Sequence, residues 1–420
     1  MKKLLFSLFT CTTLSISLLS GQETEKSIVI SAADGQKEEI DLPQGMISTT
    51  DSLYLDWISK HYINPNENCT MRTENPPVSD SIYMDRLKRI PAIIEMPYNE
   101  IVRKFIDMYA TRLRQKVAFM LSANNFYMPI FEEALDLYDL PLELKYLPVI
   151  ESALNPMATS TQGATGLWQF MLRTGQVYGL KVNSLVDERR DPIKSTRAAA
   201  RYLKDLYDIY QDWNLVLAAY NCGPGTINKA IRRAGGDKDF WEIYNYLPKE
   251  TRGYVPAFIA ANYIMTYYCE HYISPMEMRM PESTDTIHVS RPLNLNQVAD
   301  VCKINIDELR ALNPEFKKDL IPGNEKPYAL RLPTNMVSTF IDKEDSIYAY
   351  KADTYLTRRP TVAVKNATGT SKGKAVYHRI RNGETLGGIA ARYGVSINQL
   401  RRLNGIKGSN IRAGKSLRIR

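Results

Sequence analysis

From residue 98 to residue 275, apolar positions recur with the period of an α-helix, and the alternation typical of strands is nearly absent. Asn99 precedes the first helical segment and is a residue type that caps helix N-termini. The apolar residues of that segment lie at helical spacing: Ile101, Val102, Phe105, Ile106, Tyr109, Leu113, Val117 and Met120. The pattern predicts an all-α domain of about 180 residues, long enough to bury a core.

Residues 22–97 precede this domain and lack the helical period. They are polar and turn-rich, with prolines that include Pro65, Pro76, Pro77, Pro91 and Pro97. Proline lacks a backbone N–H and interrupts both helices and central strands. We expect an extended, partly ordered N-terminal arm.

After Pro275 the chain contains two similar segments, residues 285–334 and 376–420. Their first parts, residues 284–314 and 375–405, align without a gap at a separation of 91 residues. Each predicts strand, helix, helix and strand, and self-similarity of this kind indicates a duplicated module. Residues 350–375 between them are rich in Thr, Lys and small residues and predict a linker. The corresponding pairs are Leu295/Leu386, Val298/Ile389, Ala299/Ala390, Ile306/Ile397, Leu309/Leu400, Leu312/Leu403 and Asn313/Asn404. The fold class we expect is therefore multidomain, with an all-α domain followed by small α+β (βααβ) modules.

The first 21 residues have the features of a secretory signal peptide, because Lys2 and Lys3 precede the apolar run LLFSLFTCTTLSISLLSG. We expect cleavage after Ser20 or Gly21 and a periplasmic or cell-envelope location. The run lies at the lower length limit for a bilayer span, so an uncleaved anchor is the alternative. Lipidation at Cys11 is possible but not favoured, because LFTC is a poor lipobox.

Export implies an oxidising compartment in which disulfides persist. The mature chain keeps Cys69, Cys222, Cys269 and Cys302. Four cysteines allow three pairings, and the sequence does not choose among them. Their spacing fits no zinc pattern, and the chain has only 4 His, so we expect no metal site.

The net charge of +8 is concentrated at the C-terminus. Residues 371–420 carry 12 Lys and Arg against one acid, Glu384, which gives +11 and leaves −3 for residues 1–370. A uniformly basic nucleic-acid-binding protein is therefore not indicated. The basic tail either binds an anionic partner or is solvated.

Glu151 is the most informative polar residue of the helical domain. It follows the apolar run LPVI, and Asn155 precedes Pro156, which disfavours helix at that point. Apolar neighbours disfavour the carboxylate and raise its pKa, which keeps a glutamic acid protonated as a general acid. The alternative is a helix-end glutamate in a salt bridge.

Two further clusters carry polar groups. Between residues 217 and 231, Asn221 to Gly225 break a helix, and glycine there lets a ligand approach closely; the alternative is an ordinary helix–turn–helix. Between residues 247 and 258, Glu250 and Tyr254 stand at i and i+4 and share one face of a helix.

Four blocks, ESALNP, GLWQFM, AAYNCGPG and ETRGYVPAF, together resemble the lytic transglycosylase (goose-type lysozyme-like) domain over about residues 125–270. The whole architecture is similar to lytic transglycosylases of the membrane-bound D type, which carry LysM modules. The segment 376–420 resembles LysM closely. The segment 285–334 is a degenerate copy: it has RPLNL in place of the GET turn and four extra residues before its last strand. Whether it binds glycan or is only a spacer stays open.

The resemblance implies roles for individual residues. Glu151 matches the single catalytic acid/base, and Cys222 stands where the family usually has alanine. The residues matched to the substrate groove and its support are Ser160, Gln169, Met171, Tyr220, Asn221, Glu250 and Tyr254.

The resemblance also implies the reaction. Glu151 protonates the β-1,4 oxygen between N-acetylmuramic acid and N-acetylglucosamine, and the muramyl 6-hydroxyl then closes a 1,6-anhydro ring. Peptidoglycan glycan strands are the implied partner, and no cofactor is implied.

Two other functions stay open. A lysozyme-type hydrolase needs a second acid, such as Glu250 or Asp187, within ~5–9 Å of Glu151. A non-catalytic wall-binding protein is expected to have lost a site residue, whereas the chain keeps Glu151, Ser160, Gln169, Tyr220 and Glu250.

Overall fold

The computed structural model describes residues 26–31, 37–47, 69–276, 281, 283–356, 377–380, 384–393, 397–406 and 411–419. The chain divides into two compact units, Met1–Pro360 and Thr361–Arg420. The predicted signal peptide with Cys11, and most of the predicted linker, lie outside the described residues. Within the described part of the chain, no helix is long and apolar enough to cross a membrane.

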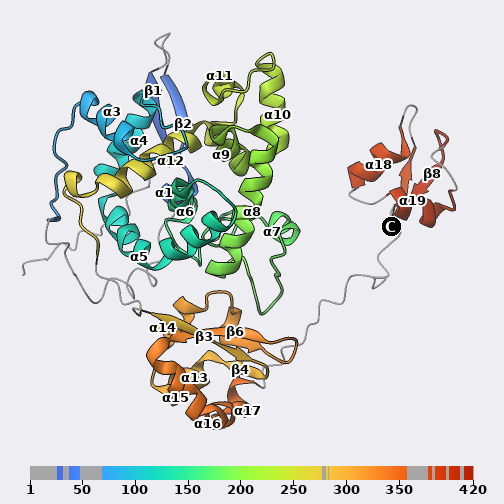
Figure 1. The fold of residues 1–420 in the computed structure, drawn as a ribbon. Coiled ribbons are helices and arrows are strands. Elements are labelled where there is room, and N and C mark those ends of the chain that lie inside the picture. Colours follow the sequence, from blue (N-terminus) through green and yellow to red (C-terminus); the bar gives the residue numbers. More distant parts are fainter. Residues whose placement is uncertain are drawn as a thin grey trace, which may run out of the picture. The chain divides into compact units, whose positions relative to one another are not determined.

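The first unit contains the predicted helical domain, coloured from cyan to yellow in Figure 1. Asn99 caps α4 as predicted, because its Oδ1 accepts a hydrogen bond from Val102 N at 2.9 Å. Helix α12 is buried along most of its length and packs against α4, α6 and α9. The α-helices are α1 (Gln44–Ile47), α3 (Asp80–Arg89), α4 (Glu100–Ala110), α5 (Arg114–Leu137), α6 (Leu147–Ser152), α7 (Leu172–Val177), α8 (Pro192–Tyr210), α9 (Trp213–Cys222), α10 (Pro224–Arg233), α11 (Phe240–Ile243) and α12 (Lys249–Tyr267). Three 3-10 helices, η1 (Leu142–Tyr146), η2 (Tyr244–Tyr246) and η3 (Cys269–His271), join them.

The N-terminal segment has more regular structure than its turn-rich sequence suggested. Strands β1 (Ser27–Ser31) and β2 (Lys37–Asp41) form an antiparallel hairpin, and α3 follows. The hairpin is held because Ile28, Ile30 and Ile40 are buried in the core of the helical domain. Strand β2 lies directly against α12, where a Cβ on Gly253 would come within 2.6 Å of Asp41 O.

One disulfide fastens this segment to the end of the helical domain. Cys69 is bonded to Cys269, with 5.0 Å between the two Cα atoms, and Arg72 N donates to Tyr272 O at 3.0 Å. Cys222 and Cys302 are free thiols. The structure thus selects one bond among the pairings that the sequence left open.

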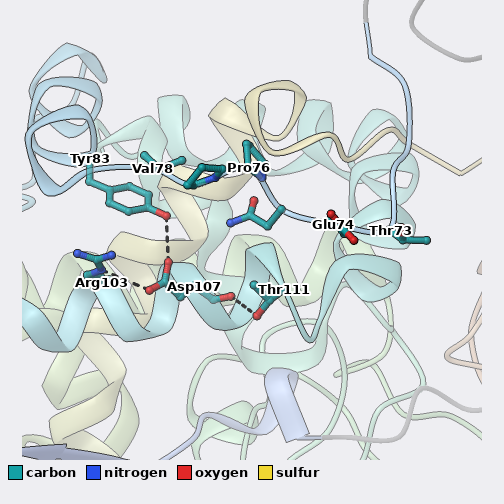
Figure 2. Close-up of a pocket in the computed structure, with 10 residues that line it drawn as sticks. Thr73, Glu74, Pro76, Val78, Tyr83, Arg103, Asp107 and Thr111 are labelled. Carbon is teal, nitrogen blue, oxygen red and sulfur yellow. Dashed lines mark hydrogen bonds and ion pairs between the residues drawn. The ribbon is translucent and has the colours of Figure 1, made fainter.

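A pocket of about 600 Å³ lies between residues 73–78 and helices α3 and α4 (Figure 2). Tyr83 of α3 donates a hydrogen bond to Asp107 Oδ1 of α4 at 3.0 Å. Arg103 Nε lies 3.4 Å from the other oxygen of the same carboxylate. None of the predicted site residues lines this pocket.

The inner module (residues 283–356) belongs to the same unit and has its own hydrophobic core. Strand β3 pairs with β6 and β4 with β5, both antiparallel. Phe340 and Ile347, from the helices that follow β6, complete the core. Its elements are β3 (Thr284–Val289), β4 (Pro292–Asn294), α13 (Leu295–Cys302), α14 (Ile306–Leu312), β5 (Leu320–Pro322), β6 (Tyr328–Pro333), α15 (Val337–Asp342), α16 (Glu344–Ala349) and α17 (Ala352–Tyr355); the 3-10 helices η4 (Lys317–Asp319) and η5 (Thr334–Met336) complete it.

The C-terminal module (residues 377–419) repeats this plan in the second unit. It consists of β7 (Tyr377–Arg379), α18 (Leu386–Tyr393), α19 (Ile397–Asn404) and β8 (Ser416–Arg418), with β7 antiparallel to β8. Asn313 in the inner module and Asn404 here make the same contacts: each side chain donates to the carbonyl four residues earlier, and each exchanges two hydrogen bonds with the last strand. The predicted duplication and the predicted fold class are confirmed.

Candidate active site

Glu151 lies in the last turn of the short helix α6. Helix η1 ends at Tyr146 and Pro148 stands in the first turn of α6, where its missing N–H costs no hydrogen bond. Ala153 and Leu154 then take left-handed conformations (φ 52° and 61°) and end the helix. The sequence therefore places Glu151 at the point where a buried helix opens into a loop.

The Glu151 carboxyl is held in its protonated form by its surroundings. Burial raises its pKa to about 8; the hydrogen bond from Tyr254 opposes this rise, and the charge of Glu250 adds to it. The predicted upward shift is therefore confirmed in direction. Among the described residues Glu151 forms no ion pair, so the salt-bridge alternative is not supported. This shift favours the protonated form of Glu151 at neutral pH.

Two tyrosines from different helices interact with this carboxyl, one by a hydrogen bond and one through its charge. Tyr254 of α12 donates a hydrogen bond to Glu151 Oε1. Tyr220 of α9 donates to Trp168 O at 2.8 Å, and the charge of Glu151 acts on its hydroxyl. Burial raises the pKa of both tyrosines, so both remain neutral hydrogen-bond donors.

The break after α9 lies where the sequence predicted it. Gly223 has φ 82°, which ends α9, and Pro224 begins α10. Thr251 Oγ1 donates to Asn221 Oδ1 at 2.8 Å and so connects the end of α9 to the start of α12. Glu250 is half-buried in the first turn of α12, within electrostatic reach of Glu151.

The groove loop (residues 153–171) carries the other predicted site residues. Ser160 N donates a hydrogen bond to Ala164 O at 2.9 Å, and Ser160 Oγ accepts one from Ala164 N at 3.1 Å. Gln169 has φ 46°, and its Nε2 donates to Gly166 O at 2.8 Å. Met171 is 44% exposed, so it presents apolar surface to solvent.

Arg189 holds the groove loop from outside it, a role that the sequence did not indicate. Arg189 is buried, and its Nη1 donates to Gly163 O at 2.9 Å and to Phe170 O at 3.0 Å. Its string, DERR at residues 187–190, stood out only as a charged run. A charged run does not indicate which carbonyls it will meet.

Asp187, one of the two candidates for a second acid, is occupied by Arg189. The two side chains form a bidentate pair at 2.9 and 2.8 Å. Burial opposes ionisation of Asp187, but the hydrogen bonds from Arg189 outweigh it and lower its pKa. Glu250 remains the second carboxyl that acts on Glu151.

Comparison with known proteins assigns the domains. Residues 128–243 match the family model of the Transglycosylase SLT domain. The helical domain is a transglycosylase SLT domain. The inner module matches the LysM-like domain of lytic transglycosylase MltD over residues 283–349, and the C-terminal module matches the LysM domain over residues 378–420. Glu250 and Tyr254 lie beyond the residues that match the SLT model.

Named relatives agree with this assignment. The chain is 33% identical over 293 residues to Membrane-bound lytic murein transglycosylase D of Escherichia coli K12. The aligned region covers 67% of this chain and 60% of that protein. It is 31% identical over 140 residues to Soluble lytic murein transglycosylase of Salmonella typhimurium, and this aligned region covers 32% of this chain and 21% of the relative. The chain thus spans less than two thirds of the length of these relatives.

Among the solved structures that match, one is similar to part of this chain. The 70 kDa soluble lytic transglycosylase SLT70 of Escherichia coli is 26% identical and covers 36% of this chain and 26% of its own, with a TM-score of 0.30.

Proposed function

We propose that the protein is a peptidoglycan lytic transglycosylase that cleaves the β-1,4 bond between N-acetylmuramic acid and N-acetylglucosamine. The observation that carries this proposal is the Glu151 carboxyl of the SLT domain, with its pKa raised to about 8 by burial and its Oε1 hydrogen-bonded by Tyr254. A carboxylic acid that is protonated at neutral pH is suited to protonating a leaving-group oxygen. The relatives named above are called lytic murein transglycosylases.

The proposed reaction uses one carboxyl twice. Glu151 gives its proton to the glycosidic oxygen as the bond to C1 breaks, which leaves an oxocarbenium-like sugar and a carboxylate. That carboxylate removes the proton from the muramyl 6-hydroxyl, whose oxygen forms the new bond to C1. The 6-hydroxyl proton restores the acid form of Glu151, the first proton stays on the leaving group as a free 4-hydroxyl, and the other product end is a 1,6-anhydro ring. Tyr254 stabilises the carboxylate between the two steps through its hydrogen bond.

The other predicted site residues surround this centre in the proposal. Ser160, Gln169 and Met171 border the sugar from the groove loop, and Tyr220 and Asn221 border it from the end of α9. Tyr220 is oriented by its hydrogen bond to Trp168 O, and Asn221 by Thr251. Glu250 supports the site by adding to the upward pKa shift of Glu151.

The C-terminal LysM module is proposed to hold the enzyme on its polymer. It forms a separate compact unit, and residues 371–420 carry a net charge of +11, against −3 for the rest of the chain. A tether of this kind raises the local concentration of substrate without taking part in the chemistry. We propose that the chain is exported to the cell envelope, where the glycan strands of peptidoglycan are both substrate and anchor.

The second candidate, a lysozyme-type hydrolase, is favoured by one observation, the effect of Glu250 on Glu151. Digestion of purified sacculi followed by mass analysis of the released muropeptides tests both. A transglycosylase yields products with a 1,6-anhydro end, ~18 Da lighter than hydrolytic products because no water is added. Products with free reducing ends would support the hydrolase, and an intact sacculus would refute both.

A further inference from the structure

The loop between α7 and α8 (residues 181–190, the bridge loop) joins the SLT domain to the inner module. Val186 forms an antiparallel β-bridge with Phe316 of that module. Two backbone hydrogen bonds flank this pair: Asp187 N to Glu315 O at 2.9 Å, and Lys317 N to Leu185 O at 2.7 Å. The bridge loop thus pairs with the inner module as a short strand.

Apolar burial anchors this pairing. Leu185 is 6% exposed and Val186 1% exposed, and both belong to the hydrophobic core of the inner module rather than to that of the SLT domain. Charged groups surround the contact in pairs: Lys317 Nζ lies 3.8 Å from Asp187, and Lys326 Nζ lies 3.3 Å from Glu188. The bridge loop completes the core of the inner module. The module therefore holds the bridge loop in position, and the loop in turn stabilises the module.

The other side of the bridge loop holds the groove loop. The backbone N–H of Asp187 donates to Glu315 O of the inner module. The carboxylate of Asp187 accepts two hydrogen bonds from Arg189. The third guanidinium nitrogen of Arg189, Nη1, donates to Gly163 O and Phe170 O. Gly166 packs so closely on this loop that a Cβ there would lie 1.9 Å from Arg189 O. A continuous chain of contacts therefore runs from Phe316 to the groove loop.

We propose that the inner module braces the substrate groove, with Arg189 as the positioning residue through which it acts on Ser160 and Gln169. This role is distinct from the spacer and glycan-binding roles that its degenerate LysM sequence leaves open. The catalytic part of the proposal rests on the proposed transglycosylase function; the mechanical part does not. A short displacement of groove residues is costly to catalysis, because reacting groups must be held in a narrow range of positions.

Local contacts within the bridge loop do not make the module dispensable. Asn183 Oδ1 accepts from Leu185 N and Val186 N, and Glu188 N donates to Lys181 O, so the loop has a turn of its own. Without the module, however, Leu185 and Val186 would face water. Apolar side chains in that position favour rearrangement of the loop.

The mechanical part is tested by hydrogen exchange in the full-length chain carrying Glu151→Gln, so that the measurement needs no activity. Val186→Ser removes the apolar anchor, and Phe316→Leu loosens it while keeping the interface apolar. Each should accelerate exchange of groove-loop amides, by ~10-fold for Val186→Ser. The matched control is Ile341→Ser, which changes an exposed apolar residue of the same module and should leave these amides unchanged. Unaltered exchange in both interface variants would overturn the brace.

The catalytic part is tested by turnover of short soluble peptidoglycan glycans. Val186→Ser and Arg189→Met should each lower kcat ~10- to 100-fold, with Arg189→Lys between Arg189→Met and wild type, while the alkaline limb of the pH profile is unmoved. The double variant Val186→Ser/Arg189→Met should be no slower than Arg189→Met alone, because both changes act through one chain of contacts. Multiplied losses in the double variant would overturn the role of Arg189. No cleavage by the wild-type chain would refute the proposed function instead, and the exchange result would still decide the brace.

Discussion

Tyr254 of α12 donates a hydrogen bond to Glu151 Oε1, although the two residues lie on different helices and 103 positions apart. Burial favours the protonated form of Glu151, whereas this hydrogen bond favours the carboxylate. The opposition leaves the pKa near 8, close to working pH, where one group can both give and take a proton. The pair thus provides what a single acid/base requires.

Glu151→Gln is expected to abolish glycan cleavage and to leave the fold and wall binding intact. Glutamine has nearly the same shape but gives up no proton, so the loss of general acid catalysis should lower kcat by at least ~10²–10⁴. Glu242→Gln, at an exposed position in α11, is the matched control and should cleave at the wild-type rate. Turnover above a tenth of wild type in purified Glu151→Gln would show that Glu151 is not the acid.

The pH dependence of cleavage should report the pKa of Glu151. Because the protonated form is the acid, kcat/KM should fall as pH rises through about 8. Tyr254→Phe removes the interaction that lowers this pKa, so the alkaline limb should move to higher pH. The carboxylate also loses a hydrogen bond, which should lower kcat ~10-fold or more. An alkaline limb that does not move in Tyr254→Phe would show that this hydrogen bond does not set the pKa that the limb reports.

Deletion of residues 371–420 should weaken retention on insoluble peptidoglycan and leave cleavage of short soluble glycans nearly unchanged. The C-terminal module is a separate unit and contributes local concentration rather than chemistry. Co-sedimentation with sacculi and turnover of soluble fragments measure the two effects. Equal losses on polymer and on fragments would contradict a tether.

Loss of the Cys69–Cys269 bond should lower the free energy of unfolding of the first unit by ~2–5 kcal/mol, because it closes a long loop. Thermal unfolding of Cys69→Ala/Cys269→Ala, with and without reductant, measures this. Cys222→Ala, which removes a free thiol, is the control and should keep the wild-type response to reductant. A double variant as stable as wild type would show that the bond contributes nothing.

Features with a local signal could be predicted from the sequence. The cap at Asn99, the helix break at Gly223 and the apolar neighbours of Glu151 each depend on residues nearby in the chain. The 91-residue repeat aligned Asn313 with Asn404, and the structure gives both side chains the same hydrogen bonds. These features follow from chain periodicity, capping chemistry and internal similarity.

Features that depend on distant partners could not be predicted. The Cys69–Cys269 bond occurs in only one of the three pairings that four cysteines allow, and the sequence does not single it out. Val186 likewise gives no sign in the sequence that it pairs with Phe316. Arg189 was one of several charges in a run, and its two carbonyl partners follow only from the folded groove loop. In each case tertiary packing, rather than local propensity, selects the partner.

The most direct test of the central claim is the source of the oxygen at the new chain end. If Glu151 acts first as acid and then as base towards the substrate's own 6-hydroxyl, no water enters the product. Digestion of sacculi in ¹⁸O-labelled water should therefore yield unlabelled 1,6-anhydro-muramyl ends, favoured because intramolecular attack has a large proximity advantage. Incorporation of ¹⁸O at C1 in most of the product would contradict the account and identify a hydrolase that uses a second carboxyl such as Glu250.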